Sequence, residues 1–216
     1  GNATLTAVAG DVLLAAGATS IGGALTLAAP TGAVTQSGGS ITATGLAVVA
    51  AKSSSLTAGG NNTATLAAEI GGVAQDFAYT DTNALTLGPV ASLSGLAVSG
   101  TANIAAATSN LTLAGPVSAG GNLLLTAAAG AVTQSSGTVT ATGLAVTAGA
   151  TSSLVQAGND IGTLAAFVAA GARDFSYADA NDVSIGTVGG LVGLSVGRNA
   201  SITAGAGAVS QTAAIQ

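Results

Sequence analysis

The strongest constraint on the fold is an internal repeat. Residues 32–48 read GAVTQSGGSITATGLAV and residues 130–146 read GAVTQSSGTVTATGLAV, which are identical at 14 of 17 positions with an offset of 98 residues. The same offset carries the DFAYTDTN run at residues 76–83 onto the DFSYADAN run at residues 174–181. Self-similarity at a fixed period is typical of solenoids, so the sequence predicts a repeat protein.

A second offset indicates a smaller unit. The run NLLLTAAAGAVTQ from Asn122 returns as NASITAGAGAVSQ from Asn199, with an offset of 77 residues. The two offsets differ by 21 residues, so a unit of about this length is added or omitted as a whole. Each unit of such a chain contacts only its neighbours. The predicted division is a single solenoid segment with extra single coils at 1–21 and 99–119, repeats of about four units at 22–98 and 120–196, and a third repeat that starts at 197.

Short strands fill each unit. Apolar and small polar residues alternate over a few positions, and Gly and Asn clusters such as GGNN at 59–62 separate these runs. Alternation with Thr and Val favours strands, and Gly and Asn supply the positive φ of tight corners. Stacked at about 4.8 Å per coil, about ten coils make a rod of roughly 50 Å. We therefore predict an all-β parallel β-helix, with strand runs at 25–27, 46–48, 55–57, 85–87 and 96–98.

Comparison of the two copies predicts which side chains face inward. Glu69 corresponds to Phe167, and a position that accepts both a carboxylate and an aromatic ring is expected outside the core. Four aliphatic pairs are the predicted core: Leu46/Leu144, Val48/Val146, Leu56/Leu154 and Leu66/Leu164. A helix over 66–74 and 164–172 is the alternative, because Leu-Ala-Ala runs have good helix propensity.

Composition excludes several function classes. The chain has no Cys, His, Met or Trp, so thiol nucleophiles, imidazole bases, disulfides and Cys/His zinc sites are impossible. Three basic residues against eight acids do not neutralise a row of phosphates, so we expect no nucleic-acid partner. The longest apolar stretch, 164–172, is far shorter than the roughly 18 residues of a membrane-spanning helix, so we expect a chain that does not span a membrane.

The GAVTQ…TATGLAV run, AGNDIGTLAA at 157–166 and DFSYADANDVSIGTVGGL at 174–191 resemble the repeat region of filamentous-haemagglutinin-like exoproteins. These are large bacterial surface proteins exported by two-partner secretion. The likeness covers essentially the whole chain and rests on the degenerate repeat pattern rather than on a catalytic motif. It implies a right-handed β-helix, an extracellular or cell-surface location, and a role in adhesion or as a stalk. Nothing here matches the amino-terminal secretion domain of that family, so the sequence is expected to be an interior fragment.

Several residue patterns suggest chemistry, each with a structural alternative. Acids and amides offer oxygen ligands for Ca²⁺, although their spacing fits Asx turns as well. They are Asp76, Asp81 and Asn83, with Asp174, Asp179, Asn181 and Asp182 in the second copy.

Aromatic pairs at Phe77/Tyr79 and Phe175/Tyr177 lie two residues apart and point to one side of an extended chain. They either stack on sugar rings or pack an excursion loop against the coil. Sequons occur at Asn2, Asn61, Asn110 and Asn199. Threonines at 42, 44, 140 and 142 suggest an ice-binding face, but the TxT pattern does not recur in every coil.

The sequence thus predicts a non-enzymatic structural or adhesive segment of a large bacterial surface or secreted exoprotein. No catalytic, cofactor-binding or metal residue is predicted, and no cofactor. The expected partners are sister copies or adjacent repeats, packed end to end or laterally, and host or matrix glycans. The alternatives are a self-assembling filament subunit joined through open β-helix edges, and an ice- or glycan-binding solenoid.

Overall fold

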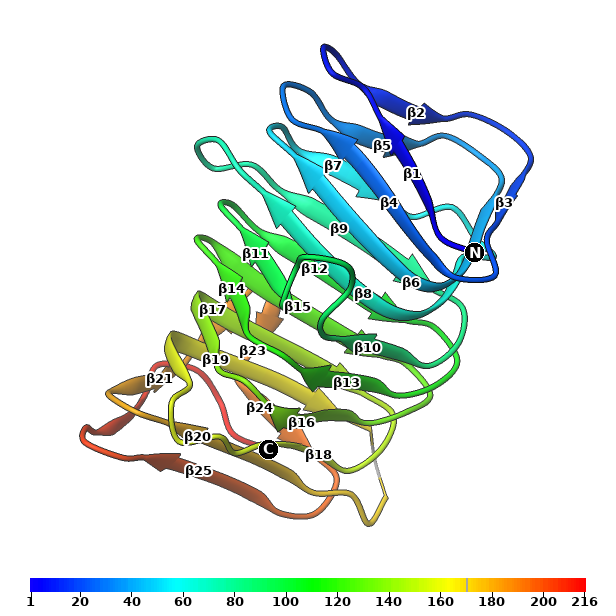
Figure 1. Ribbon diagram of the computed structural model, residues 1–216. Helices are drawn as coiled ribbons and strands as arrows, with labels where there is room; N and C mark the ends of the chain where they lie inside the picture. The colour runs from blue at the N-terminus through cyan, green and yellow to red at the C-terminus, as the bar shows by residue number, and fades with distance from the viewer. Residues whose placement is uncertain (170) are drawn as a thin grey trace.

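The chain forms a β-solenoid of about ten stacked coils, seen from the blue amino-terminal coil to the red carboxy-terminal coil in Figure 1. This computed structural model describes residues 1–169 and 171–216. No helix occurs within those ranges. The strands are β1 (Ala3–Thr6), β2 (Val12–Leu14), β3 (Ala18–Ser20), β4 (Ala24–Ala29), β5 (Val34–Gln36), β6 (Ser40–Ala50), β7 (Ser54–Leu56), β8 (Asn62–Ile70), β9 (Phe77–Asp81), β10 (Leu85–Leu87), β11 (Leu96–Val98), β12 (Ala102–Ala106), β13 (Leu111–Ala114), β14 (Val117–Ala119), β15 (Asn122–Ala127), β16 (Val132–Ser136), β17 (Val139–Ala148), β18 (Ser152–Leu154), β19 (Asp160–Val168), β20 (Phe175–Asp179), β21 (Val183–Ile185), β22 (Thr187–Val188), β23 (Leu191–Val192), β24 (Leu194–Val196), β25 (Ala200–Ala204) and β26 (Val209–Gln211).

Parallel pairing between successive coils builds the stack. Leu25 pairs with Leu46, and Leu46 pairs with Leu66, so identical side chains lie one above another. Paired residues in the 24-stranded sheet are 20 to 28 positions apart, as in the 20-residue step from Leu46 to Leu66 and the 28-residue step from Ala68 to Leu96. The 21-residue unit of the sequence is therefore one coil, and the coils vary in length where loops are inserted.

A single apolar core runs along the axis of the solenoid. One continuous cluster of buried side chains extends from Val12 to Leu194. All eight predicted core residues are fully buried, at 0% exposure, whereas Glu69 is exposed and Phe167 is 43% exposed. The inward prediction is confirmed because most strands bury alternate residues, as in β9, where Phe77, Tyr79 and Asp81 are buried between half-buried neighbours.

The helical alternative is wrong. Residues 66–70 belong to β8 and residues 164–168 to β19, where backbone pairing to neighbouring coils replaces helical bonds. Residue 170 of the second stretch lies outside the described residues. Tertiary pairing along a full-length sheet outweighs the modest helix propensity of Leu and Ala. Among the described residues, no helix has the length and apolar character needed to cross a membrane.

Side chains at the corners tie each coil to the next. An Asp or Asn oxygen accepts the backbone N–H of a residue 21 to 26 positions later, so the acceptor of one coil satisfies a donor of the following coil. The acceptor–donor pairs are Asn2–Ala24, Asp11–Ala33, Asp76–Thr101, Asn110–Ala131, Asp174–Asn199 and Asp182–Ala208.

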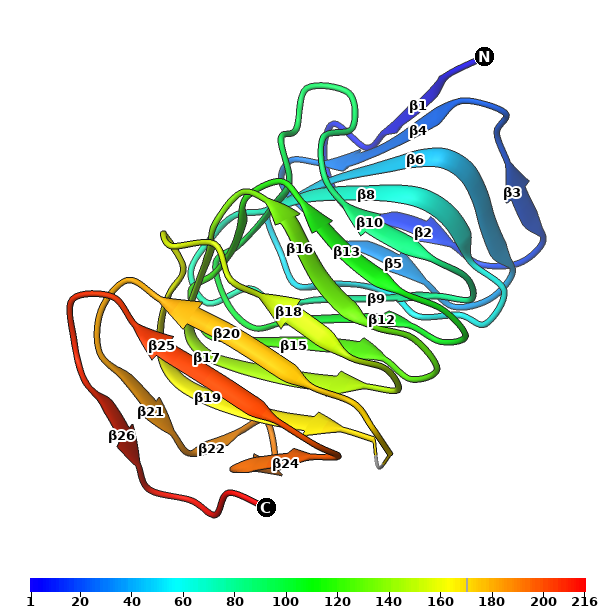
Figure 2. The ribbon, with the colours of Figure 1, turned by 90° about the horizontal axis from the view of Figure 1, so that it is seen from below.

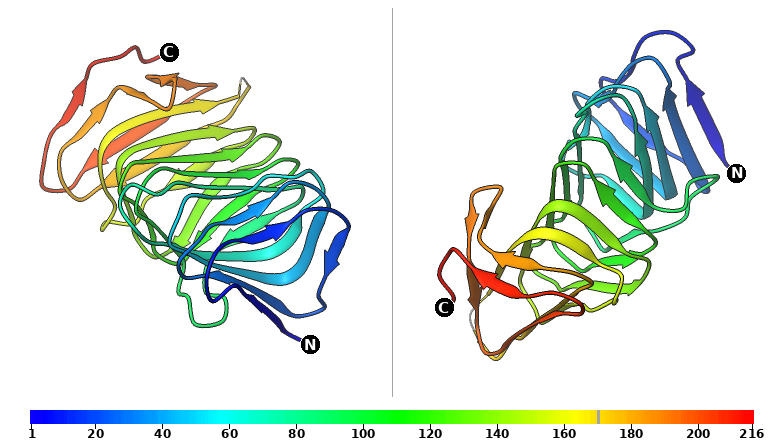
Figure 3. Two further views of the ribbon diagram at one scale, coloured as in Figure 1. Left: turned by 90° about the horizontal axis from the view of Figure 1, so that it is seen from above. Right: turned by 90° about the vertical axis from the view of Figure 1, so that its left-hand side faces the viewer.

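Equivalent residues of the two sequence copies lie on different faces of the rod. Leu46 is stacked with Leu25 and Leu66, but its counterpart Leu144 is stacked with Leu123 and Leu164. The column of Leu123 continues through β12 to β9 of the first copy. The 98-residue repeat is thus not a whole number of coils, and each copy is turned about the axis relative to the other. Figure 3 shows the stacked coils in two further views.

Candidate functional site

Each copy carries a short hairpin that folds back over the outside of the sheet. In the first copy Val90 and Leu93 form an antiparallel bridge between β10 and β11. In the second copy β22 and β23 pair antiparallel. The hairpins account for the longest coil steps, and they project to different sides of the rod (Figure 2).

Small residues on the sheet surface form the seat of each hairpin. Val90 packs on Ala47 and Ala67 in one cluster, and Val188 packs on Ala145 and Ala165 in its counterpart. A Cβ atom at Gly45 would lie 2.9 Å from Cγ1 of Val90.

The second copy shows the same restriction. A Cβ atom at Gly143 would lie 3.0 Å from Cγ1 of Val188. A Cβ atom at this glycine of the repeated TATGLAV run would thus crowd the hairpin valine in both copies.

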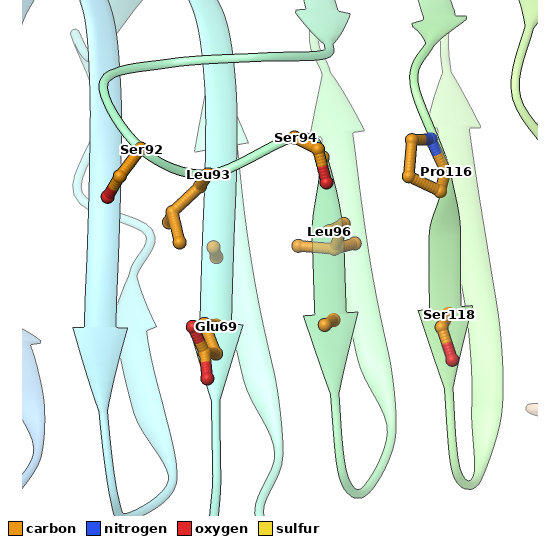
Figure 4. A pocket seen from close by; sticks show the side chains of 10 residues that line it. Glu69, Ser92, Leu93, Ser94, Leu96, Pro116 and Ser118 are labelled. Atoms are coloured by element: carbon orange, nitrogen blue, oxygen red, sulfur yellow. The ribbon is translucent and has the colours of Figure 1, made fainter.

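A shallow hollow of about 310 Å³ lies beside the first hairpin (Figure 4). Leu93 and Pro116 border it, Glu69 lies at one end, and Ser92, Ser94 and Ser118 contribute hydroxyl groups. In the second copy Phe167 replaces Glu69, so the only acid of this hollow is not repeated. Its chemistry is that of a weakly polar surface depression.

A paired amide network lies inside each copy, and the sequence reasoning missed it. Asn61 is fully buried, and its Oδ1 accepts the backbone N–H of Ile41 at 2.9 Å. Its Nδ2 donates to Oε1 of Gln36 at 3.0 Å and to the carbonyl of Leu56 at 3.1 Å, while Nε2 of Gln36 donates back to Oδ1 at 2.9 Å.

The same network recurs 98 residues later. Asn159 bonds with Gln134 and with the N–H of Val139. The available signal was the recurrence of Gln in GAVTQ and of Asn after the corner glycine, at 61 and 159.

Buried carboxylates are bonded to tyrosines rather than arranged for a metal. Oδ2 of Asp81 accepts the hydroxyl of Tyr79 at 2.9 Å and the N–H of Thr63 at 2.7 Å, and Oδ1 accepts the N–H of Asn83 at 2.8 Å. Burial, with the neighbouring Asp81 carboxylate adding to it, raises the pKa of Tyr79 far above its usual range. The phenol therefore stays neutral as a donor.

The second copy repeats this arrangement. Tyr177 donates to Asp179 at 2.7 Å, and Asp179 also accepts the N–H groups of Ile161 and Asn181. Burial and the bond to Asp179 raise the pKa of Tyr177 in the same way.

The calcium candidates are not brought together. Asp76 precedes β9 and Asp81 is its last residue, and Asp174 and Asp179 have the same places at β20. Asp182 bonds the N–H of Ala208. Across residues 1–169 and 171–216, no three acidic side chains gather within reach of one ion. The Asx-turn alternative describes Asp81 and Asp179, which accept the N–H two residues later, whereas Asp76, Asp174 and Asp182 accept N–H groups of the next coil.

The aromatic pairs face the core. Phe77 and Tyr79 point to the same side, as predicted, but they are 1% and 0% exposed within β9. Phe175 and Tyr177 are equally buried in β20. They neither present a face to sugar rings nor pack an excursion loop, because they belong to the coil itself.

The threonines at 42, 44, 140 and 142 are exposed but form no rank. Thr42 is stacked between Ser20 and Asn62, and Thr140 between Ser118 and Asp160. A different hydroxyl column, which sequence reasoning missed, runs along the outside of seven coils. Its members are Thr65, Thr86, Thr112, Thr133, Ser153, Ser176 and Ser201.

The sequons differ in accessibility. Asn61 is buried in its amide network, whereas Asn2, Asn110 and Asn199 are exposed at corners. Only the exposed three are open to modification in the folded chain.

An ion pair between Arg198 and Asp174 lies on the surface. Nε of Arg198 donates to Oδ1 of Asp174 at 2.7 Å, and its second nitrogen, Nη2, contacts Oδ2. This hydrogen-bonded guanidinium lowers the pKa of Asp174 to about 2, and the carboxylate in turn raises the pKa of Arg198.

A family model described as repeats of unknown function (DUF5649) matches residues 1–69 and 101–168, well over half of the chain. The chain belongs to this family. Each matched segment contains one complete Gln–Asn network, Gln36 with Asn61 and Gln134 with Asn159. The network is thus part of what the repeat encodes. No curated protein and no solved structure matches the chain.

Proposed function

We propose that the chain is a non-enzymatic, rod-like segment of a large bacterial surface or secreted protein, where it serves as a stalk. The observation that carries the proposal is the unbroken core from Val12 to Leu194, over which each coil rests on the previous one. Such a stack converts sequence length directly into physical length, at about 4.8 Å per coil. The resemblance to filamentous-haemagglutinin-like repeats supports the surface location.

The distribution of polar groups supports a structural role. Among the described residues no buried side-chain nitrogen or oxygen lacks a hydrogen-bond partner. The buried acids and tyrosines are committed to each other and to the backbone, as at Tyr79 and Asp81. Groups held in this way position the coils and are not free for acid–base chemistry.

Labelling of intact bacterial cells tests the location. An antibody raised against the folded chain is expected to label unpermeabilised cells that produce the full parent protein, and brief external proteolysis is expected to remove the label. An antibody against a cytoplasmic protein is the control. Labelling that requires permeabilisation would contradict the proposal.

Deletion of one coil tests the length function. The N–H of Ser99 bonds the carbonyl of Ile70, and the N–H of Gly120 bonds the carbonyl of Val98, so Gly120 takes the place of Ser99 when 99–119 are removed. We expect a folded rod that is shorter by about 4.8 Å, measured by X-ray scattering of the purified chain.

Deletion of 99–109 is the matched control, because it removes half a coil and puts the downstream strands out of register. It is expected to unfold the coils beyond the junction. Equal tolerance of both deletions would contradict the stacked-rod proposal.

A further inference from the structure

A shallow groove lies on the outer face of β7, β9 and β12. Its volume is about 330 Å³, and small side chains form its floor at Ala78 and Ser55. Ser53, Asp76, Thr101 and Asn103 lie along the groove and bring a carboxylate, hydroxyls and an amide to it. None of these groups belongs to the hairpin seats or the buried networks described above.

The carboxylate of Asp76 is only half used. Its Oδ1 accepts the N–H of Thr101 at 2.7 Å, which fixes the orientation of the group. Its Oδ2 has no hydrogen-bond partner within residues 1–169 and 171–216. Asp76 is exposed, so this oxygen is available to a ligand.

In the second copy the equivalent carboxylate binds an arginine of the chain itself. Asp174, 98 residues after Asp76, accepts the N–H of Asn199 in the same way. Here Arg198 docks on the carboxylate through Nε and Nη2, and Nδ2 of Asn199 adds a bond at 3.1 Å. The position equivalent to Arg198 in the first copy is Gly100, so no arginine reaches Asp76 from this position.

We propose that the Asp76 groove binds an arginine side chain of a partner polypeptide. The forked guanidinium matches a carboxylate in geometry, as Arg198 does on Asp174, and a lysine ammonium lacks this fork. The partner is a basic segment, because the chain carries a net charge of -5 and attracts positive charge. Asn103 and Ser55, in the same groove, offer oxygens to the remaining N–H groups of the arginine.

Nuclear magnetic resonance titration of the whole chain with N-acetyl-arginine amide tests the proposal. Because one exposed ion pair is weak, the probe is added to millimolar concentration. We expect saturable shifts at residues lining the groove. N-acetyl-lysine amide is expected to bind at least roughly threefold more weakly than N-acetyl-arginine amide. Diffuse shifts that do not saturate, or equal binding of the two probes, would overturn the proposal.

Two variants sharpen the test. Asp76→Asn keeps the oxygen that accepts the Thr101 N–H but removes the charge, and it is expected to abolish the saturable shifts. Arg198→Ala uncovers Asp174, and it is expected to add a second set of saturable shifts around Asp174 and Asn199. Binding that survives Asp76→Asn, or an unchanged number of sites in Arg198→Ala, would contradict the assignment.

Discussion

Replacement of Asn61 by alanine removes the centre of the buried amide network. The N–H of Ile41 loses its acceptor and the carbonyl of Leu56 loses a donor, both in the buried interior. A buried backbone group left without a partner costs about 1–3 kcal/mol, so the two groups together cost about 2–6 kcal/mol. Gln36 also loses its reciprocal partner. The expected result is a free energy of unfolding lowered by an amount in that range.

Chemical denaturation followed by circular dichroism measures this change, and hydrogen exchange of the Ile41 amide locates it. Asn62→Ala is the matched control, since Asn62 is exposed and adjacent. Asn159→Ala is expected to destabilise the chain to a similar extent, because its network repeats that of Asn61. An Asn61→Ala variant as stable as Asn62→Ala, with Ile41 still protected, would refute the reasoning.

Three further predictions concern the hairpin and the titrating groups. Gly45→Val places side-chain atoms against the hairpin and should expose residues 88–94 to protease while the core remains folded; Gly22→Val, where a Cβ meets nothing within 4 Å, should not. The raised pKa values of Tyr79 and Tyr177 mean that the folded chain holds these phenol protons more tightly than the unfolded chain does. This contribution to the free energy of unfolding is complete below the ordinary tyrosine pKa of about 10. It is lost as the pH rises above that value. Near-ultraviolet phenolate absorbance should then appear only with loss of circular dichroism, and phenolate in a folded chain would contradict this. The lowered pKa of Asp174 stabilises the folded chain at pH values above the ordinary pKa of an aspartate, and this stabilisation is lost as the pH falls toward 2. The melting temperature should therefore fall more steeply with acid in the wild type than in Arg198→Ala. Parallel curves for the two proteins would argue against the ion pair.

The sequence was sufficient for the coil and its core, because both follow from a local rule. Alternation fixes which residues face inward, and comparison of the two copies separated Leu66 from Glu69 without other information. The same pattern placed the strand runs at 25–27, 46–48, 55–57, 85–87 and 96–98 within or overlapping observed strands.

Features that depend on stacking between coils could not be predicted in this way. The Ala47 and Ala67 seat forms only when two coils meet, and Val90 reaches it from a later part of the chain. The turn of the second copy about the axis depends on the summed lengths of the intervening coils. Phe77 and Tyr79 were expected to stack on sugar rings or to pack an excursion loop, but the alternation of the FAYTD run is that of a coil strand with both rings inward.

Distances between spin labels test the stacked coils most directly. The chain has no cysteine, so pairs introduced in the outer hydroxyl column carry the only labels. Thr86 and Ser176 are four coils apart and Thr65 and Ser201 are six coils apart. At about 4.8 Å per coil, the backbone separations are about 19 Å and about 29 Å. The account predicts that the distance measured by double electron–electron resonance for the second pair exceeds that for the first by about two coil spacings. Distances that do not increase with the number of coils between the labels would contradict it.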